Sequence, residues 1–245
     1  MHLFYAPIQE NGCCVLSEEE SLHCSKVLRL KQGDLALVCN GKGGLYRCRF
    51  LSVTTKCCIA EIEEVLQEPN QNEIQRQASL VHVIVAPTKQ MERMEWFLEK
   101  ATEVGLSEVS FVICAHSERT VVKTERIEKI LISAMKQSQQ AYLPFLHPQA
   151  SLKEILARPL EDGVQKFIAY CGPEYERKDY ISVVNPHKPV TILIGPEGDF
   201  TAEEVALCVE KGYTPVSLGA TRLRTETAAL YACWAVAILN DFVKP

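Results

Sequence analysis

Three glycine-bearing segments that follow apolar runs contain the residues best suited to chemistry. They span 169–173, 195–200 and 218–227. Glycine lets the backbone approach a ligand closely and present bare amides, and Pro196 fixes the shape of the second segment. Ligands of open parallel sheets bind beyond the carboxyl ends of the strands. We therefore expect these segments to meet around one ligand.

Ionisable side chains stand in two of these segments. Glu197 is in the second, and Arg224 and Glu226 are in the third. An arginine can stabilise developing negative charge. We expect Thr225 to cap a following helix, whose positive N-terminal end favours an ionised Glu226. The structural alternatives are an Arg224–Glu226 surface ion pair and a Glu197 carboxylate that only braces its turn.

The glycine pattern excludes some common nucleotide-binding sites. Neither the 195–200 nor the 218–227 segment is a G-x-G-x-x-G or a Walker A sequence. This argues against a dehydrogenase or a kinase. Ordinary strand-to-helix turns remain an alternative for either segment alone, but two such segments at successive strand ends weaken it. Cys171 has no histidine nearby in the sequence to act as a base, so we do not expect a nucleophile there.

Alternating strands and helices position these segments. The apolar run 80–87 predicts a strand buried on both faces. Further strands are expected at 109–114, 166–171, 190–195 and 215–219, and helices at 91–104, 124–140, 151–157, 201–212 and 225–240. Such alternation is typical of an α/β domain with a mostly parallel sheet covered on both faces.

The N-terminal part has a different pattern. Residues 1–67 indicate short strands and turns, which favour a small β-barrel. Ser17 and Glu20 form a capping-box pattern for a helix over 18–27, and a polar stretch at 68–77 indicates a linker. We place the barrel at 1–70, the linker at 71–78 and the second domain at 79–245.

Composition limits the class of protein. The chain has 245 residues, of which 47% are hydrophobic and 23% charged, as in folded globular proteins. No run approaches the roughly 18 apolar residues of a membrane span, and the N-terminus lacks signal-peptide features. We expect a cytoplasmic protein with no membrane partner. Eleven cysteines occur without a Cys-x-x-Cys, so we expect no metal site and mostly buried thiols.

Charge is unevenly distributed along the chain. The formal net charge is −5, which argues weakly against nucleic-acid binding. Residues 21–56, however, contain seven basic residues and one acidic residue, which suits contacts to phosphates. A second basic cluster comprises Arg119, Lys123, Arg126, Lys129 and Lys136. The alternative for both is a solvated face of mixed charge.

Several motifs together resemble one family. GPEGDF follows VTILI, and SLGATRLRTETAAL follows later. HCSKVLRLKQGD, MERMEWFLEKATEVG, HSERTVVK and IEKILISAMKQSQQAYLP add matches along essentially the whole chain, in order. The combination is similar to the small-subunit ribosomal RNA uridine N3-methyltransferases, the RsmE family of the knotted SPOUT class.

The resemblance implies both a fold and an activity. The fold is α/β: a C-terminal SPOUT domain with a mostly parallel sheet and a deep trefoil knot, and a small N-terminal PUA-like barrel that contacts RNA. The knot rests on the resemblance alone, because true knots are nearly absent from proteins. The implied activity is S-adenosylmethionine-dependent methylation of N3 of one uridine in 16S rRNA of the small ribosomal subunit. The implied assembly is a homodimer whose second subunit lies against the cofactor site.

The resemblance also implies site residues. The cofactor-binding set is Tyr170, Cys171, Gly195, Pro196, Glu197, Gly198, Leu218, Gly219, Leu223, Arg224 and Thr225. The catalytic candidates are Arg224, Glu226 and Glu197. Arg224 would stabilise charge on the uracil oxygens, while Glu226 or a water would take the N3 proton. The RNA-binding candidates are Lys26, Arg29, Lys31, Arg47, Arg119, Lys123 and Lys136.

One departure from the family pattern concerns the helix over 124–140. The family often has an acidic residue and an arginine flanking a Gln-Ser pair, where this chain has Lys136 and Gln140. We expect Lys136 to take the place of that arginine. A second hypothesis, from another class, is a non-catalytic RNA-binding or ribosome-assembly factor that retains the fold.

Overall fold

The computed structural model describes residues 1–9, 12–68 and 81–243. The chain divides into two compact units by its internal contacts. The first comprises Met1–Gln75 with Ile132–Leu143, and the second comprises Arg76–Leu131 with Pro144–Pro245. The predicted linker at 71–78 lies outside the described residues, so the domain boundaries stay predictions.

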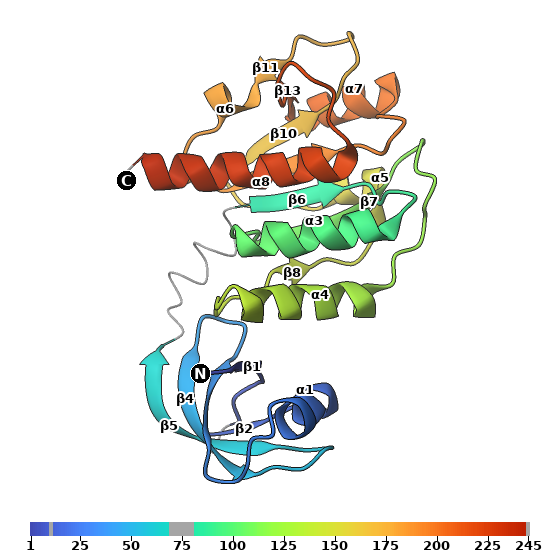
Figure 1. Cartoon of the computed structure of the whole chain (residues 1–245). Helices are drawn as coiled ribbons and strands as arrows, with labels where there is room; N and C mark the ends of the chain where they lie inside the picture. Colours follow the sequence, from blue (N-terminus) through green and yellow to red (C-terminus); the bar gives the residue numbers. More distant parts are fainter. Residues whose placement is uncertain (10–11, 69–80, 244–245) are drawn as a thin grey trace. The chain divides into compact units, whose positions relative to one another are not determined.

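A curled five-stranded sheet forms the first unit (Figure 1). Its elements are β1 (Leu3–Tyr5), β2 (Cys13–Val15), α1 (Glu18–Leu22), the π-helical η1 (His23–Val27), β3 (Leu35–Cys39), β4 (Leu45–Ser52) and β5 (Ile59–Gln67). The strand order is β1-β3-β4-β5-β2, with only β1 and β3 parallel. An isolated bridge from Ile8 to Cys14 connects the segment after β1 to β2, which agrees with the predicted barrel.

The predicted capping box of the first helix forms only in part. The hydroxyl of Ser17 accepts a hydrogen bond from the amide of Glu20 at 3.2 Å. The Glu20 carboxylate contacts the ammonium of Lys136 in the same unit instead of returning to Ser17. The expected reciprocal bond was therefore wrong, because an ion pair takes the carboxylate. The helical extent, 18–27, matches α1 and η1 together.

The second unit is a parallel α/β sheet. Its first elements are β6 (Val81–Val85), α3 (Met91–Glu103), β7 (Glu108–Ile113), α4 (Thr124–Gln137), which the two units share, β8 (Phe145–Leu146), β9 (Ala150–Ser151) and α5 (Leu152–Ala157). The remainder are β10 (Gln165–Ala169), β11 (Lys178–Asp179), α6 (Tyr180–Val183), β12 (Val190–Ile194), α7 (Ala202–Glu210), β13 (Thr214–Ser217) and α8 (Thr225–Phe242). The strand order is β11-β13-β10-β12-β6-β7-β8, and β9 also pairs with β7.

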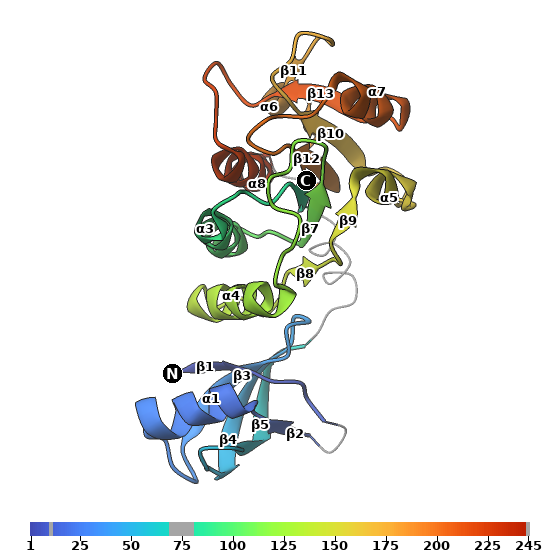
Figure 2. The ribbon, with the colours of Figure 1, turned by 90° about the vertical axis from the view of Figure 1, so that its right-hand side faces the viewer.

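Both faces of this sheet are covered. Helices α3 and α8 lie on one side, while α5 and α7 lie on the other (Figure 2). Every residue of β12 is buried, as expected for a central parallel strand with an apolar sequence. All strand pairs among the described residues of this sheet are parallel. The predicted α/β class is confirmed.

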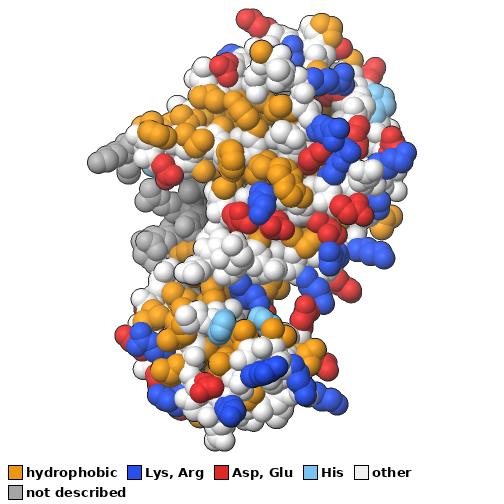
Figure 3. Space-filling model, viewed as in Figure 1, with side chains coloured by type: hydrophobic (Ala, Val, Ile, Leu, Met, Phe, Trp, Pro, Cys, Tyr) orange, Lys and Arg blue, Asp and Glu red, His pale blue; other side chains and the backbone are white. Residues whose placement is uncertain are grey.

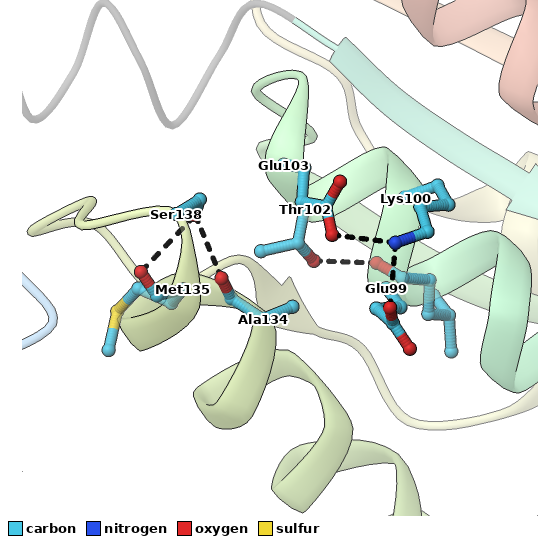
Figure 4. A network of polar contacts seen from close by, with 8 residues as sticks. Glu99, Lys100, Thr102, Glu103, Ala134, Met135 and Ser138 are labelled. Atoms are coloured by element: carbon cyan, nitrogen blue, oxygen red, sulfur yellow. Dashed lines mark hydrogen bonds and ion pairs between the residues drawn. The ribbon is translucent and has the colours of Figure 1, made fainter.

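Local chemistry ends the helices where the sequence predicts. Gly105 and Gly212 have φ of +94° and +84° just beyond α3 and α7, a conformation that suits glycine. Figure 4 shows side chains near the ends of α3 and α4 bonding to carbonyls of their own helix. Thr102 donates to the Leu98 carbonyl at 2.7 Å, and Ser138 donates to the Ala134 carbonyl at 2.8 Å. The Ala134 carbonyl also accepts from the Ser138 amide at 2.9 Å, so the hydroxyl adds a second bond to an acceptor that is already paired.

Most cysteines are core residues, as predicted. All eleven are free thiols, and all but Cys13, Cys57 and Cys171 are buried. Burial raises the pKa of Cys39 to about 11 and that of Cys208 to about 12. These two thiols therefore stay protonated at neutral pH and pack as small apolar side chains.

Helix α8 exposes an apolar stripe. Trp234, Ile238 and Phe242 are at least half exposed and recur every four residues along one face. Trp96 of α3 is also exposed, and hydrophobic side chains gather over α8 and α3 in the space-filling view (Figure 3). No helix in the described part of the chain is long and apolar enough to cross a membrane. The stripe is a large apolar surface for a protein to leave open to water.

Candidate active site

The three predicted segments meet at the carboxyl ends of the strands. They follow β10, β12 and β13, which are neighbours in the order β13-β10-β12. Together they line a cavity of about 750 Å³, a size typical of small-molecule sites. All predicted cofactor residues except Gly198 line it: Tyr170, Cys171, Gly195, Pro196, Glu197, Leu218, Gly219, Leu223, Arg224 and Thr225.

Gly198 lies behind the cavity rather than in its wall. A Cβ on this residue would lie 3.0 Å from the Cβ of His116, so a side chain would crowd the loop after β7. The His116 ring nitrogen Nδ1 is 3.0 Å from the carbonyl oxygens of both Gly198 and Asp199. Gly198 therefore permits close packing of two loops.

Asp199 holds the 195–200 loop in shape. Its backbone is in the left-handed region, with φ of +63°. One carboxylate oxygen accepts from the amide of Cys171 at 2.8 Å, and the other accepts from the amide of Phe200 at 2.9 Å. Asp199 also lines the cavity, although the sequence analysis did not select it. The available signal was an aspartate at a turn position, where this residue tolerates positive φ.

Thr225 connects the start of α8 to the end of β12. Its buried hydroxyl donates to the Gly195 carbonyl at 3.0 Å. Arg224 is the N-cap residue, with φ of −72° and ψ of 156°, and Thr225 is the first residue of the helix. The prediction of Thr225 as the cap was wrong, because its hydroxyl serves the carbonyl of the neighbouring loop.

Glu226 has a buried oxygen with no partner. The residue is 6% exposed, and its Oε1 lies 3.9 Å from Nε of Arg93. Its Oε2 is buried without a hydrogen-bond partner among the described residues. Buried carboxylate oxygens are usually satisfied, so this atom is suited to meet a ligand or a water. Arg93 comes from α3, far away in the sequence, and the sequence analysis missed it.

Two predicted functional residues hold the segment after β6. Glu197 accepts from the amide of Lys89 at 3.1 Å. Arg119 donates to the Lys89 carbonyl at 2.7 Å and to the Thr88 carbonyl at 3.2 Å. The bracing alternative for Glu197 therefore matches its observed contact, and part of the Arg119 guanidinium is used within the fold.

The loop after β10 folds on the Tyr170 side chain. The Tyr170 hydroxyl accepts from the Tyr175 amide at 2.7 Å and donates to the Tyr175 carbonyl at 3.0 Å. Burial raises the pKa of Tyr170, so its hydroxyl stays protonated. Arg177 donates to the Tyr170 carbonyl at 3.1 Å, with its guanidinium 5.9 Å from the ring centroid. Arg177 also lines the cavity and was not predicted.

The predicted RNA-binding residues differ in availability. Lys26, Arg29, Lys31 and Lys123 are exposed. Arg47 pairs with Glu64 in the first unit, and Lys136 pairs with Glu20. The exposed group is therefore the better candidate for contacts to phosphates.

The fold and cavity define a class of protein. A parallel sheet presents glycine-bearing loops, apolar side chains, four arginines and a buried carboxylate around one opening. Such a site can bind a nucleoside-like ligand against backbone groups and offer charged groups to a second reactant.

Comparison with known proteins gives the family. An RNA methyltransferase domain family matches residues 75–237, and an RNA methyltransferase PUA domain family matches residues 16–63. The first match spans more than half of the chain. The chain therefore belongs to this RNA methyltransferase family, and the resemblance noted in its sequence is confirmed.

Relatives and solved structures agree with this assignment. The chain is 26% identical to ribosomal RNA small subunit methyltransferase E of Bacillus subtilis, over 97% of this chain and 94% of that protein. It is similar to a crystal structure of a probable rRNA-methyltransferase from Porphyromonas gingivalis, with 37% identity, a TM-score of 0.84 and 99% of both chains covered. The corresponding enzyme of Neisseria gonorrhoeae, bound to S-adenosyl methionine, has 26% identity, a TM-score of 0.80, and 99% and 100% coverage.

Proposed function

We propose that this protein transfers a methyl group from S-adenosylmethionine to N3 of one uridine in 16S rRNA, in the cytoplasm. The single observation that carries the proposal is the shared cavity. Two of the family's sequence motifs, GPEGDF after β12 and SLGATRLRTETAAL from the end of β13, contribute residues to that cavity together. The names of the relatives, and the S-adenosyl methionine bound to the Neisseria enzyme, support both the donor and the RNA class.

The cavity suits the donor in size and in chemistry. Its volume of about 750 Å³ can take a nucleoside with a short amino-acid chain. Leu218 and Leu223 offer apolar contact to an adenine ring, and the Gly195 and Gly219 backbones allow close approach. When bound, the donor supplies an electrophilic methyl group on a positively charged sulfur. The buried Oε2 of Glu226 is a free acceptor at the same site.

Arg224 and Glu226 are the proposed catalytic residues. Uracil N3 carries a proton, so attack on a methyl group requires its removal or stabilisation of the anion that forms. Arg224 is exposed at the rim of the cavity, where its guanidinium can meet the uracil oxygens. Glu226 Oε2, or a water bound to it, takes the N3 proton.

Glu197 and Asp199 act as positioning residues in this scheme. Their carboxylates accept backbone amides of Lys89, Cys171 and Phe200. These bonds fix the loops that form the cavity walls. Much of the rate of a displacement reaction comes from aligning donor and acceptor, so rigid walls contribute directly.

The first unit is proposed to hold the RNA. Its exposed basic residues Lys26, Arg29 and Lys31 suit contacts to phosphates. The target uridine must leave its stack to reach a methyl group in the cavity, which favours a loop or the assembled small subunit as substrate. We further propose a homodimer formed through the apolar stripe of α8 and Trp96.

The test is nucleoside mass spectrometry of 16S rRNA from cells with and without this gene. The proposal expects 3-methyluridine to be missing from the deletion strain and restored by the wild-type gene but not by Arg224→Ala. Restoration by Arg224→Ala at equal protein level would instead support the non-catalytic assembly factor. Unchanged 3-methyluridine in the deletion strain would reject the proposed activity.

A further inference from the structure

A second cluster of side chains that can bind metal lies away from the cavity, near the amino ends of the parallel strands. His82 and Glu108 are near the amino ends of β6 and β7 and face each other in register. His147 directly follows β8, and its backbone amide donates to the Val109 carbonyl at 2.9 Å. Register and alternation place these three side chains on the same face of the sheet. The proposed methyl transfer uses none of them.

The three side chains converge on one carboxylate oxygen. Glu108 Oε2 is 2.5 Å from Nε2 of His147 and 4.0 Å from Nδ1 of His82. Their candidate ligand atoms all lie within 4.8 Å of one another. Each side chain is 15–26% exposed, so an ion bound here would be largely shielded from bulk water.

The surroundings hold both imidazole rings in place. His82 Nε2 is 2.8 Å from the hydroxyl of Ser110, which leaves Nδ1 to face Glu108. The His147 ring stacks on that of His82, with centroids 4.8 Å apart, and meets the edge of Phe145. Outer hydrogen bonds of this kind fix the ring orientation of metal-bound histidines. Beside the cluster is a cavity of about 240 Å³, also lined by Arg158 and Glu161, with room for water.

We propose that His82, Glu108 and His147 bind one Zn²⁺, with water from this cavity as the fourth ligand. Two neutral imidazoles and one carboxylate are an established zinc donor set that leaves a position open. Tetrahedral zinc places its ligand atoms about 3.3 Å apart. The 2.5 Å contact therefore opens and the 4.0 Å distance closes, which rotation of the Glu108 side chain can achieve.

From the sequence we expect no metal site, because no ligands stand at metal-binding spacing. His82 and Glu108 lie in β6 and β7, and His147 follows β8, so the three form no short spaced motif. Only the register of β6, β7 and β8 brings them together. A bound ion would connect the short strand β8 to β6 and β7, and so would stabilise this edge of the sheet.

The test measures metal content in the full-length, tag-free protein after equilibration with Zn²⁺ and dialysis. We expect one zinc per chain in the wild type, and a loss of that zinc in both His147→Gln and Glu108→Gln. Ser110→Ala should weaken binding about 10–100-fold. His2→Ala and Cys171→Ser are the matched controls, since both residues are exposed and outside the cluster, and both should keep the zinc.

Replacement of zinc by Co²⁺ identifies the ligands by absorption. A nitrogen and oxygen site gives visible d–d bands without thiolate charge-transfer absorption. Zinc should also raise the melting temperature of the wild type but not of His147→Gln, whose own unfolding transition shows whether it folds. Metal retained in both cluster variants, or lost only in Cys171→Ser, would overturn the proposal.

Discussion

The side chains around the large cavity are of two kinds. Some form hydrogen bonds that fix the loops, and others have polar atoms without a hydrogen-bond partner in the described structure. Side-chain oxygens of three residues form hydrogen bonds with backbone groups of neighbouring loops: Thr225, Asp199 and Glu197. Glu226 keeps one buried oxygen without a partner in the described structure. That contrast separates positioning residues from candidates for contact with reactants.

Thr225→Val tests the bond that connects α8 to β12. Valine has nearly the same shape but leaves the buried Gly195 carbonyl without its donor. We expect a loss of about 1–3 kcal/mol in the free energy of unfolding, together with weaker binding of the methyl donor. Urea unfolding and calorimetry measure the two effects. The exposed Thr227→Val is the matched control, and an equal loss in both variants would contradict this role.

Residue roles were only partly predictable from the sequence. Arg224, Glu226 and the glycines of the cavity were found because they follow apolar strands within short motifs. Arg93 and Arg177 were missed because Arg93 lies on α3 and Arg177 in the loop after β10, both outside the three glycine-bearing segments. The contact of Arg119 with the Lys89 carbonyl was likewise hidden, because it joins two loops far apart in the chain.

Elements of the second unit follow closely from periodicity and capping. Thr201 and Glu204 form a capping box at the start of α7, in which each side chain accepts a hydrogen bond from the backbone amide of the other residue. Glu204 also accepts from the Ala115 amide at 2.8 Å, so one carboxylate caps α7 and holds the loop after β7. The two-residue strands β8, β9 and β11 were not predicted, because such short pairings carry no periodic signal.

Glu204→Ala tests this double contact. The variant removes the reciprocal bond of the cap and the acceptor for Ala115. We expect it to lose at least about 1 kcal/mol in the free energy of unfolding. Glu210→Ala, at the exposed C-terminal end of the same helix, should leave stability nearly unchanged. Equal stability of the two variants in urea would show that the cap and the contact to Ala115 contribute little.

For the whole molecule, the pattern of strands and helices predicts the class of fold but not the threading of the chain. The trefoil knot entered only through resemblance to a family, because periodicity encodes which elements form and not how they pass one another. The distribution of charge can likewise be interpreted only for the whole molecule. A chain with net charge −5 still presents exposed lysines and an arginine in its first unit.

Changing Lys26, Arg29 and Lys31 together to alanine tests the RNA-binding role of the first unit. Loss of three phosphate contacts should weaken binding to 16S rRNA and reduce the slope of log affinity against log salt by about 2–3. The exposed lysines Lys153, Lys178 and Lys188 of the second unit, changed together, provide a control of equal charge. An unchanged salt slope in the first variant would place the RNA elsewhere.

Trp234→Asp tests the proposed homodimer. A charge within the exposed stripe of α8 should shift the protein from dimer to monomer in sedimentation. Ile181→Asp, at an exposed apolar position on α6, should leave the assembly unchanged. A monomeric wild-type protein at micromolar concentration would reject the dimer.

Isothermal titration with S-adenosylhomocysteine, the demethylated form of the donor, tests the central claim most directly. We predict saturable binding of one molecule per chain to the wild type. Leu218→Trp, which fills the cavity from its wall, should abolish that binding while retaining a wild-type unfolding transition. No saturable heat in the wild type, or equal binding by the folded variant, would contradict the assignment of this cavity.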